Sequence, residues 1–275
     1  MSKEVTYELG VIGAGNMAEA IIKAELHSGF LQPHEIVVAD VRQERRQKLA
    51  SELGVAWAAD NLVPAHCPRI LLSVKPQNID EVLAEIADLV DGDALVISIC
   101  AGVPTSHIDT GLGGKGHIVR VMPNTPMLVG AGMSGIAAGP RATDDDVQWT
   151  EELFATSGKT VPVDECLMDA VTAVSGTGPA YFFYLIEAMI DAGTAEGLSY
   201  EFAYQLAVQT CAGAAKLLAD TGRRPEDLRA QVTSPNGTTQ RAIETLDAAN
   251  TKDTWVAAVR AAAQRSRELG DQHAK

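Results

Sequence analysis

The sequence predicts an α/β protein in which a doubly wound, mostly parallel sheet is followed by an all-helical domain. Two observations predict this order. In residues 1–164, short runs rich in Val and Ile alternate with helical stretches, which is the pattern of repeated strand–helix–strand units. From residue 165 to the end, the sequence contains helical patterns and no convincing strand. We therefore predict one domain at 1–164 and a second, all-helical domain at 165–275.

The strands of the first domain are expected to be buried on both faces. Their apolar runs are nearly continuous and do not alternate with polar residues, as is typical of parallel strands covered by helices on both sides. The expected strands are 9–12, 35–40, 69–74, 94–100, 118–122, 133–138 and 160–163, and the helices between the early ones are 17–29, 42–53 and 78–90.

The second domain is expected to be a set of helices. The stretch 180–192 is apolar on nearly every side, and such a helix is normally buried at a domain junction or in a subunit interface. The expected helices are 179–196, 200–221, 225–232, 238–249 and 252–269.

Composition and charge exclude several classes of protein. The length of 275 residues suits one large domain or two medium ones. Acidic residues outnumber basic ones by 36 to 22, which gives a formal net charge of -14. Binding to nucleic acid or anionic membrane needs a surplus of Lys and Arg, so neither is an expected partner. No apolar run reaches the roughly 18 residues of a membrane-spanning helix, and the chain starts without an apolar signal segment, so a cytoplasmic location is expected.

Neither the cysteines nor the histidines have the spacing of a metal site. Cys67, Cys100, Cys166 and Cys211 lie far apart and form no CxxC pair, so we expect buried free thiols in a reducing compartment. The six histidines show no HxxxH or HExxH spacing. No bound metal is therefore expected.

The first chemical signal is a glycine pattern directly after the first predicted strand. Gly13, Gly15 and Ala18 form G-x-G-x-x-A, with a strand before the pattern and a helix after it. Such glycines allow a tight turn and let backbone N–H groups approach a pyrophosphate, which the positive end of the helix also attracts. The alternative is that they only permit close packing of strand and helix. The context favours a dinucleotide-binding domain of the Rossmann type.

The end of the second predicted strand leaves the choice of dinucleotide open. Asp40 lies 25 positions beyond Gly15, where an acidic side chain can meet the adenosine ribose. A carboxylate there favours NADH, because it repels a 2′-phosphate. Arg42, which is followed by Arg45 and Arg46, is instead suited to hold that phosphate, although the latter two also fit the solvated face of the next helix. Both NADH and NADPH remain candidates.

Three further strand ends carry unusual residues. One strand stops at Lys75 and Pro76, a second at Ala101 and Gly102, and a third within 120–126, where a polar pair lies between prolines. Ligands of open α/β sheets bind at such carboxyl ends. Ala101 and Gly102 are small enough for a flat ring to lie on the backbone, and Lys75 suits catalysis or a phosphate or helix-end contact. Plain turn chemistry explains any one of these loops equally well.

Two loops of the helical domain consist of small or polar residues. The first, residues 173–181, is expected to be a loop of small residues in which Pro179 lies in the first turn of the following helix. In the second, Gly237 can act as an N-cap with Thr238 and Thr239 in the first helical turn. Backbone N–H groups and hydroxyls then converge at the positive end of a helix, which suits a small carboxylate. The alternative is ordinary Ser/Thr capping.

The second domain lacks the usual proton donors of a dehydrogenase. Residues 165–272 contain no histidine, and the helix 179–197 contains no lysine. An enzyme acting on an alcohol or ketone needs a group that exchanges the proton of the oxygen. A cyclic imine can take its proton from solvent and mainly needs to be positioned.

Five motifs together resemble the pyrroline-5-carboxylate reductase family. They are GVIGAGNMAEAI at 10–21, SVKP at 73–76, RVMPNTP at 120–126, SGTGPAY at 175–181 and SPNGTT at 234–239, and the match covers essentially the whole chain. The resemblance implies an N-terminal Rossmann domain and a C-terminal helical domain through which subunits dimerise, often as a unit of larger rings. It also implies reduction of Δ1-pyrroline-5-carboxylate to L-proline with NADPH or NADH, the last step of proline synthesis.

The resemblance also assigns roles to residues. Gly13, Gly15, Asn16 and Met17 are expected at the pyrophosphate and Asn61 at the phosphate–ribose portion. The expected place of Asp40 and Arg42 at the adenosine ribose comes from their spacing after the glycine pattern and not from the resemblance. The residues expected around the nicotinamide half are Val74, Lys75, Pro76, Ala101, Gly102, Met122, Pro123, Asn124, Thr172 and Ser175. Ser234, Gly237, Thr238 and Thr239 are expected to bind the substrate carboxylate, with the Thr239 hydroxyl near the ring nitrogen. The candidates for catalytic contacts are Thr239, Ser234, Thr172 and Lys75.

The chain departs from the family pattern in the substrate loop. Asn236 stands where the family usually has Gly, and Ala230 stands where it usually has Asp. Asn tolerates left-handed backbone better than most residues, so the loop is expected to keep its shape. A contact from an acidic side chain at position 230 is missing.

The predicted activity is hydride transfer to the C=N carbon of a five-membered cyclic imine carboxylate, achieved by positioning and desolvation without a strong acid or base. One alternative is another imine reductase or a β-hydroxyacid dehydrogenase of related two-domain design. The lysine-free helix 179–197 argues against the hydroxyacid class. A non-catalytic nucleotide-binding scaffold is the alternative outside enzymes.

Overall fold

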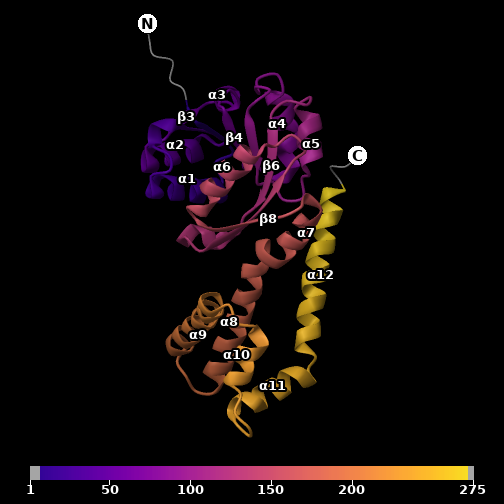
Figure 1. The fold of residues 1–275 in the computed structure, drawn as a ribbon. Coiled ribbons are helices and arrows are strands. Elements are labelled where there is room, and N and C mark those ends of the chain that lie inside the picture. Colours follow the sequence, from indigo (N-terminus) through magenta and orange to yellow (C-terminus); the bar gives the residue numbers. More distant parts are fainter. Residues whose placement is uncertain (1–6, 272–275) are drawn as a thin grey trace. The chain divides into compact units, whose positions relative to one another are not determined.

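A computed structural model of the chain describes residues 7–271 (Figure 1). Among these residues, eight strands form one sheet in the order β3-β2-β1-β4-β5-β6-β7-β8. Neighbouring strands are parallel except β6 and β7, which are antiparallel. The strands are β1 (Leu9–Ile12), β2 (Ile36–Ala39), β3 (Ala56–Ala58), β4 (Arg69–Leu72), β5 (Leu95–Ser98), β6 (His117–Met122), β7 (Gly132–Ala138) and β8 (Gly158–Pro162).

Helices connect the strands and make up the later part of the chain. The α-helices are α1 (Asn16–Ser28), α2 (Gln43–Leu53), α3 (Leu62–Ala65), α4 (Ile79–Ile86), α5 (Thr105–Gly111), α6 (Asp144–Ala155), α7 (Met168–Val171), α8 (Gly178–Ala195), α9 (Tyr200–Thr221), α10 (Pro225–Gln231), α11 (Thr238–Ala248) and α12 (Thr251–Gly270). Short 3-10 helices are Pro33–Glu35, Pro76–Asn78, Thr125–Val129 and Glu165–Leu167, and Thr172–Gly176 is π-helical. The predicted fold class, a doubly wound sheet followed by helices, is confirmed.

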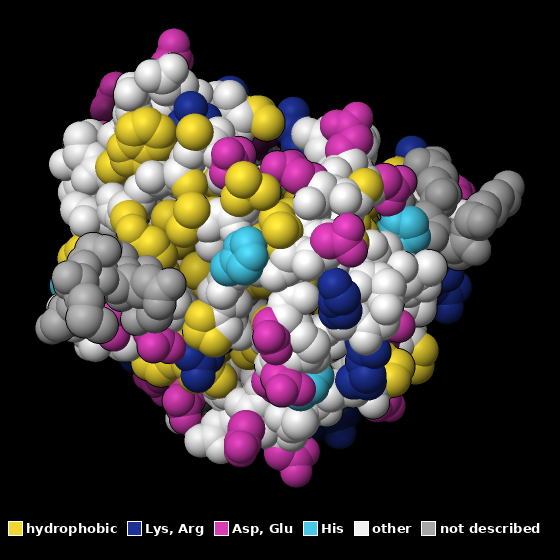
Figure 2. Space-filling view, turned by 90° about the horizontal axis from the view of Figure 1, so that it is seen from above, with side chains coloured by type: hydrophobic (Ala, Val, Ile, Leu, Met, Phe, Trp, Pro, Cys, Tyr) yellow, Lys and Arg dark blue, Asp and Glu magenta, His cyan; other side chains and the backbone are white. Residues whose placement is uncertain are grey.

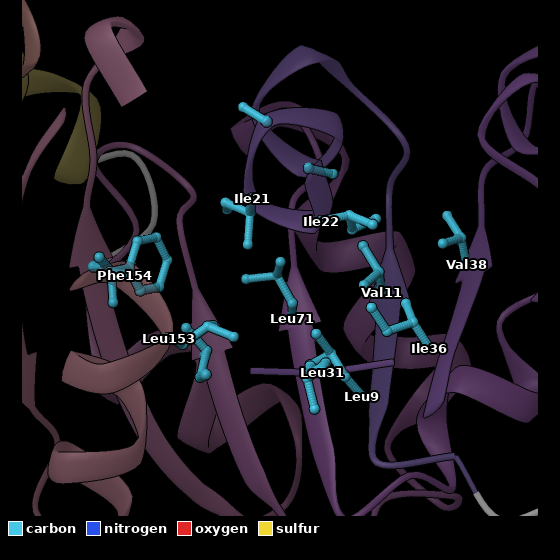
Figure 3. Packing of buried hydrophobic residues seen from close by; sticks show 14 of the residues in the cluster. Leu9, Val11, Ile21, Ile22, Leu31, Ile36, Val38, Leu71, Leu153 and Phe154 are labelled. Atoms are coloured by element: carbon cyan, nitrogen blue, oxygen red, sulfur yellow. The ribbon is translucent and has the colours of Figure 1, made fainter. Parts of the chain in front are cut away.

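The core lies on both faces of the sheet because successive side chains of each strand point to opposite sides. On one face, Val11 of β1 and Leu71 of β4 pack with Ile21 and Ile22 of α1 (Figure 3). On the other face, the next residues along the same strands pack with the apolar side of α4 and with α5. Strands β1, β2, β4 and β5 are covered on both faces, so their sequences read as uninterrupted apolar runs. The prediction of a strand buried on both faces is wrong for β8 at the end of the sheet, which is mostly exposed.

The chain divides into two compact units. The first comprises the described residues up to Thr177 together with those from Ala262 onward, and the second comprises Gly178–Ala261. The last turns of α12 therefore belong to the first unit, where Ser266 Oγ donates a hydrogen bond of 2.6 Å to Asp169 Oδ1. The boundary predicted at residue 164 precedes α7 and the π-helical segment, which this division groups with the sheet.

Acidic and basic side chains are intermixed on the surface. On the face seen in Figure 2, Asp and Glu side chains lie among Lys and Arg side chains. Ion pairs within the first unit include Arg69 with Glu8 at 2.7 Å and Arg45 with Glu19 at 2.8 Å. Among residues 7–271, no helix is both long enough and apolar enough to cross a membrane.

Candidate active site

The sheet brings most of the predicted cofactor residues to one edge. Strands β2, β1, β4, β5 and β6 are consecutive and parallel, so the loops after them leave the sheet at the same side. The chain order reverses between β1 and β4, and the loops on either side of that reversal diverge. Such a switch point is where open α/β sheets bind nucleotides.

The two glycines of the first loop are required for different reasons. Gly13 has φ of 98°, and a Cβ atom there would lie 2.5 Å from the carbonyl oxygen of Ser73. Gly15 has ordinary extended backbone as the N-cap of α1, and a Cβ atom there would meet no atom of the chain within 4 Å. Packing within the chain therefore requires a glycine at position 13, whereas the space beside Gly15, at the start of α1, is open.

The start of α1 has the properties of an anion site. Its N-cap provides no side-chain hydrogen bond, so its first backbone N–H groups have no side-chain cap. Asn16 is exposed in the first turn, whereas the side chain of Met17 packs against the core. Asn16 is thus available to a ligand through side chain and backbone, and Met17 through its backbone.

Asp40 is held in place at the end of β2. Its Oδ2 accepts a hydrogen bond of 2.8 Å from the backbone N–H of Ala14, and its Oδ1 accepts one of 2.8 Å from the backbone N–H of Arg42. Burial acts to raise the pKa of Asp40, but the hydrogen bonds from Arg42 and Ala14 outweigh it and lower the pKa below its ordinary value. The carboxylate is therefore ionised and fixed beside the glycine loop.

The three arginines after β2 all have protein partners. Arg42 directs its Nε to Asp40 Oδ1 at 3.2 Å. Arg45 donates from Nε to the Ala14 carbonyl at 2.8 Å, which ties α2 to the glycine loop. Arg46 donates to the Asp40 carbonyl at 2.7 Å and lies over the ring of Trp57.

The loop after β4 lies against the glycine loop. Val74 approaches Gly13 closely, since a Cβ atom on Gly13 would be 3.0 Å from Val74 Cγ1. Lys75 is exposed, and among the described residues it has no ion-pair partner; Pro76 follows it as the first residue of a short 3-10 helix. Asn61, before α3, donates a hydrogen bond of 2.7 Å to Glu85. Lys75 is thus a positive charge available to an anion at this edge.

The loop after β5 meets the end of α12. Ala101 is partly exposed, whereas Gly102 is buried and has φ of 78°. A Cβ atom on Gly102 would lie 3.3 Å from the Cβ atom of Leu269. Gly102 is therefore required by its backbone conformation and by the approach of α12, and the sequence pattern did not predict this contact.

Asn124 joins the loop after β6 to the segment before α8. Its Nδ2 donates to the carbonyl oxygen and to Oγ of Ser175, both at 3.2 Å, and its Oδ1 accepts from the Met133 N–H at 2.9 Å. Met122 lies against the same segment, because a Cβ atom on Gly176 would be 2.4 Å from Met122 Cε. The structure thus brings Met122, buried Pro123, Asn124 and Ser175 together.

The segment before Pro179 is helical, and the prediction of an irregular loop there is wrong. Thr172–Gly176 forms a π-helix between α7 and α8, and Thr172 is buried with its hydroxyl donating to the Met168 carbonyl at 2.8 Å. Gly176 lets this wide turn lie against Met122 of β6, where a Cβ atom would meet Met122 Cε. π-helical turns occur frequently at functional sites.

In the second unit, α11 begins as predicted. Gly237 is its N-cap, Thr238 and Thr239 lie in its first turn, and the cap provides no side-chain hydrogen bond. Asn236 has φ of 60°, the left-handed conformation for which the family usually has Gly. A Cβ atom on Gly237 would lie 2.3 Å from Ser234 Oγ, so the Ser234 hydroxyl lies directly against this backbone.

The second unit also carries a large exposed apolar surface. Phe182, Phe183 and Tyr184 of α8 and Phe202 and Leu206 of α9 are each more than half exposed within the single chain. Contiguous exposed aromatic and aliphatic side chains of this size mark protein interaction surfaces. A subunit interface is one of the two places expected for the apolar helix 180–192.

The cysteines follow the prediction in part. All four are free, and burial raises the pKa of Cys67 to about 12 and that of Cys100 to about 11. Cys166, however, is exposed and Cys211 is partly exposed, so the expectation of burial is wrong for Cys166. Among the described residues, no group of three or more His, Cys, Asp or Glu side chains could hold a metal ion.

Two carboxylates with distant partners escaped the sequence analysis: Glu165, which is partly buried, and Glu25, which is fully buried. Glu165 accepts hydrogen bonds from the N–H and hydroxyl of Thr105, at 2.7 and 2.6 Å, and from Arg120 at 3.4 Å, which ties α5 and β6 to the segment before α7. Glu25 of α1 is fully buried against Thr156. No local signal distinguishes these residues from the exposed acids of the sequence.

Fold and site define a nicotinamide-dinucleotide oxidoreductase with a Rossmann-type unit and a helical second unit. The chain is 41% identical over 264 residues to a pyrroline-5-carboxylate reductase of Methanosarcina acetivorans, with 96% of this chain and 98% of the relative covered. It is 42% identical to one of Synechocystis, with 97% and 99% covered. The chain belongs to the pyrroline-5-carboxylate reductase family.

Family models and solved structures agree with this assignment. A model described as pyrroline-5-carboxylate reductase dimerisation matches residues 165–269, and one described as NADP oxidoreductase, coenzyme F420-dependent, matches residues 8–102. The structure resembles a pyrroline-5-carboxylate reductase of Coxiella burnetii, with a TM-score of 0.90, 35% identity, and 96% and 98% of the two chains covered. It also resembles a pyrroline carboxylate reductase of Plasmodium falciparum with NADP bound, with a TM-score of 0.88, 29% identity, and 97% and 99% covered.

Proposed function

We propose that the protein reduces Δ1-pyrroline-5-carboxylate to L-proline, the last step of proline synthesis, with NADH or NADPH as hydride donor. The observation that carries the proposal is the start of α11. Gly237 N–H donates to the Ser234 carbonyl at 3.1 Å, whereas the first-turn N–H groups of Thr238 and Thr239 have no side-chain cap. Among the described residues, the hydroxyls of Thr238 and Thr239 have no hydrogen-bond partner either. This arrangement suits a small carboxylate. That the substrate also carries a C=N bond is inferred from the membership of the chain in the pyrroline-5-carboxylate reductase family.

The residues at the carboxyl edge of the sheet fit a dinucleotide. Gly15 leaves space at the uncapped start of α1, and Asp40 is fixed where an adenosine ribose follows the pyrophosphate. The segment formed by Met122–Asn124 and Ser175, with Val74, Lys75, Pro76, Ala101 and Gly102, is assigned to the nicotinamide half. When bound, the nicotinamide supplies the hydride.

The chemistry needs little from the protein beyond positioning. The substrate nitrogen takes a proton from solvent, the hydride adds to the carbon of the C=N bond, and the electron pair of that bond moves to nitrogen. The α11 start holds the carboxylate, and the Thr239 hydroxyl accepts a hydrogen bond from the protonated ring nitrogen. Ser234 supports this loop, while Thr172 and Lys75 act on the cofactor side. No residue is required as a strong acid or base.

The remaining parts of the proposal concern assembly and location. We assign dimerisation to the second unit, because its α8 and α9 expose a large apolar surface and the dimerisation model matches this part of the chain. Larger rings of such dimers and a cytoplasmic location complete the proposal.

The test is an absorbance assay at 340 nm of the purified protein with pyrroline-5-carboxylate and either reduced cofactor. Oxidation with this substrate, and at least about tenfold lower kcat/KM with the six-membered cyclic imine carboxylate, is expected, since one methylene in a fitted site changes the ratio by about that factor. A preference for the six-membered ring would favour the other imine reductase. Cofactor binding without turnover of any imine would favour the scaffold.

Thr239→Ala is expected to raise KM for pyrroline-5-carboxylate about 10- to 100-fold, because it removes a hydrogen bond to a charged group worth about 1.5–3 kcal/mol. KM for the nicotinamide cofactor should change less than about threefold, which steady-state kinetics measures in the same experiment. Thr245→Ala is the matched control, since Thr245 lies on the same helix and, among the described residues, its hydroxyl bonds only the Arg241 carbonyl. An unchanged imine KM in Thr239→Ala would remove Thr239 from the site.

A further inference from the structure

The end of β2 carries a carboxylate, Asp40, that the backbone holds beside the glycine loop. The Asp40 carboxylate receives one backbone N–H from the glycine loop at Ala14 and one from Arg42, each at 2.8 Å. These two bonds come from either side of the strand end, so the carboxylate cannot rotate away without losing both. A ribose placed beyond the pyrophosphate therefore meets a fixed negative charge.

The cations near this point are occupied by the protein. Arg45 donates to the Ala14 carbonyl and to Glu19 Oε2, each at 2.8 Å. Arg46 donates to the Asp40 and Ala59 carbonyls and stacks on the Trp57 ring, 5.2 Å from its centroid. Each guanidinium is held by at least two partners, so neither is free to turn toward a 2′-phosphate.

The other cations near Asp40 are also paired with acidic side chains. Lys23 of α1 and Lys48 of α2 both pair with Glu19, at 2.6 and 3.5 Å. Arg42 is the most exposed of the cations, yet its Nε points back to Asp40 Oδ1 at 3.2 Å. Any movement of Arg42 toward a phosphate would leave the Asp40 carboxylate without its ion-pair partner beside the same phosphate.

We infer that Asp40 makes this chain selective for NADH over NADPH. The carboxylate accepts hydrogen bonds from the ribose hydroxyls of NADH, whereas the dianionic 2′-phosphate of NADPH would lie against it. Because like charges in contact repel even in water-like surroundings and the 2′-phosphate carries nearly two charges, the expected discrimination is about tenfold or larger, equivalent to about 1.4 kcal/mol. The inference rests on the cofactor part of the proposed function and is independent of the imine.

The test measures binding without turnover. Isothermal titration calorimetry gives dissociation constants of the purified full chain for NADH, NADPH, ADP and adenosine 2′,5′-bisphosphate. NADH is expected to bind at least about tenfold more tightly than NADPH, and ADP more tightly than the bisphosphate. Tighter binding of NADPH, equal binding of the two, or binding of neither would overturn the inference. Because no imine is present, failure of reduction would not be confused with failure of selectivity.

Variants test whether Asp40 is responsible. Asp40→Asn should reduce the NADH preference about tenfold, whereas Glu44→Gln, which removes an exposed negative charge on the first turn of α2, should leave the ratio within about twofold. Asp40→Ser is the second variant and should act in the same direction. Arg42→Gln should not weaken NADPH binding selectively. A selective loss of NADPH affinity in Arg42→Gln, or an unchanged ratio in a folded Asp40 variant, would contradict the inference; if both Asp40 variants fail to fold, the wild-type ratio decides.

Discussion

Gly13→Ala is expected to abolish nucleotide binding and to destabilise the protein by about 3 kcal/mol or more. The alanine would have to adopt the left-handed backbone conformation of Gly13, and its Cβ atom would lie 2.5 Å from the Ser73 carbonyl oxygen. That oxygen belongs to the backbone after β4, so it cannot turn aside as a flexible side chain would. The glycine loop and the loop after β4 would have to move apart. Because these two loops are assigned to the nucleotide site, the site would be disrupted as well. Chemical denaturation and NADH titration measure both effects.

Gly15→Ala is the matched control for this prediction. Its Cβ atom meets nothing in the chain and its backbone is in an ordinary extended conformation, so the free energy of unfolding should change by less than about 1 kcal/mol. Nucleotide affinity should still fall by about tenfold or more, because the methyl group faces the position of the pyrophosphate. Wild-type NADH affinity in Gly15→Ala would show that the pyrophosphate does not lie against this glycine.

The second large effect is a pH dependence that originates at Glu25. This carboxyl group is fully buried, its Oε2 has no hydrogen-bond partner among the described residues, and burial raises its pKa to about 8. Thr156 Oγ1 lies 2.8 Å from both Glu25 Oε1 and the Leu153 carbonyl. One hydroxyl proton cannot serve both oxygens, whereas a protonated Glu25 that donates to Thr156 satisfies both contacts.

The sign of the effect follows from the raised pKa. The folded protein holds the proton up to about pH 8, while the unfolded chain releases it near the ordinary value of 4.5. The stabilising contribution of the bound proton is therefore complete below pH 4.5 and is lost as the pH rises toward 8. The expected loss is on the order of 5 kcal/mol, a sum of about 1.4 kcal/mol per pH unit over that interval.

Glu25→Gln should remove this dependence. At pH 8 the variant is expected to be more stable than the wild type by a few kcal/mol, and the difference should shrink toward pH 4.5. Urea denaturation at fixed protein concentration across this pH range measures it, with Glu44→Gln as a control for loss of an exposed carboxyl on the first unit. Parallel pH profiles for wild type and Glu25→Gln would contradict the account.

Local signals account for what the sequence predicted well. Helix α9 has the predicted ends because Ser199 caps its start by accepting from Phe202 N–H and Gly222 ends it in the left-handed conformation. Gly237 was identified as an N-cap for the same kind of reason. The buried strands were found because each is covered on both faces, and the glycine pattern carried weight because a strand precedes it and a helix follows.

What the sequence did not predict depends on contacts between distant residues. Strand β3 and helix α3 are only three and four residues long, too short for a periodicity to appear. The π-helical segment Thr172–Gly176 consists of residues typical of loops, and its packing under Met122 holds it in helical form. The approach of Leu269 to Gly102 and the burial of Glu25 join positions far apart in the chain. The hydrogen bonds by which Arg42, Arg45 and Arg46 are held by protein groups are likewise visible only in the structure.

The central claim is that hydride moves from the nicotinamide to the C=N carbon of pyrroline-5-carboxylate. The most direct measurement uses cofactor deuterated at the transferred position of nicotinamide C4, followed by chiral chromatography and mass spectrometry of the product. The account predicts L-proline that carries one deuterium on the ring carbon bound to nitrogen and away from the carboxylate. Proline without deuterium, or no proline from a folded protein that binds the cofactor, would contradict it.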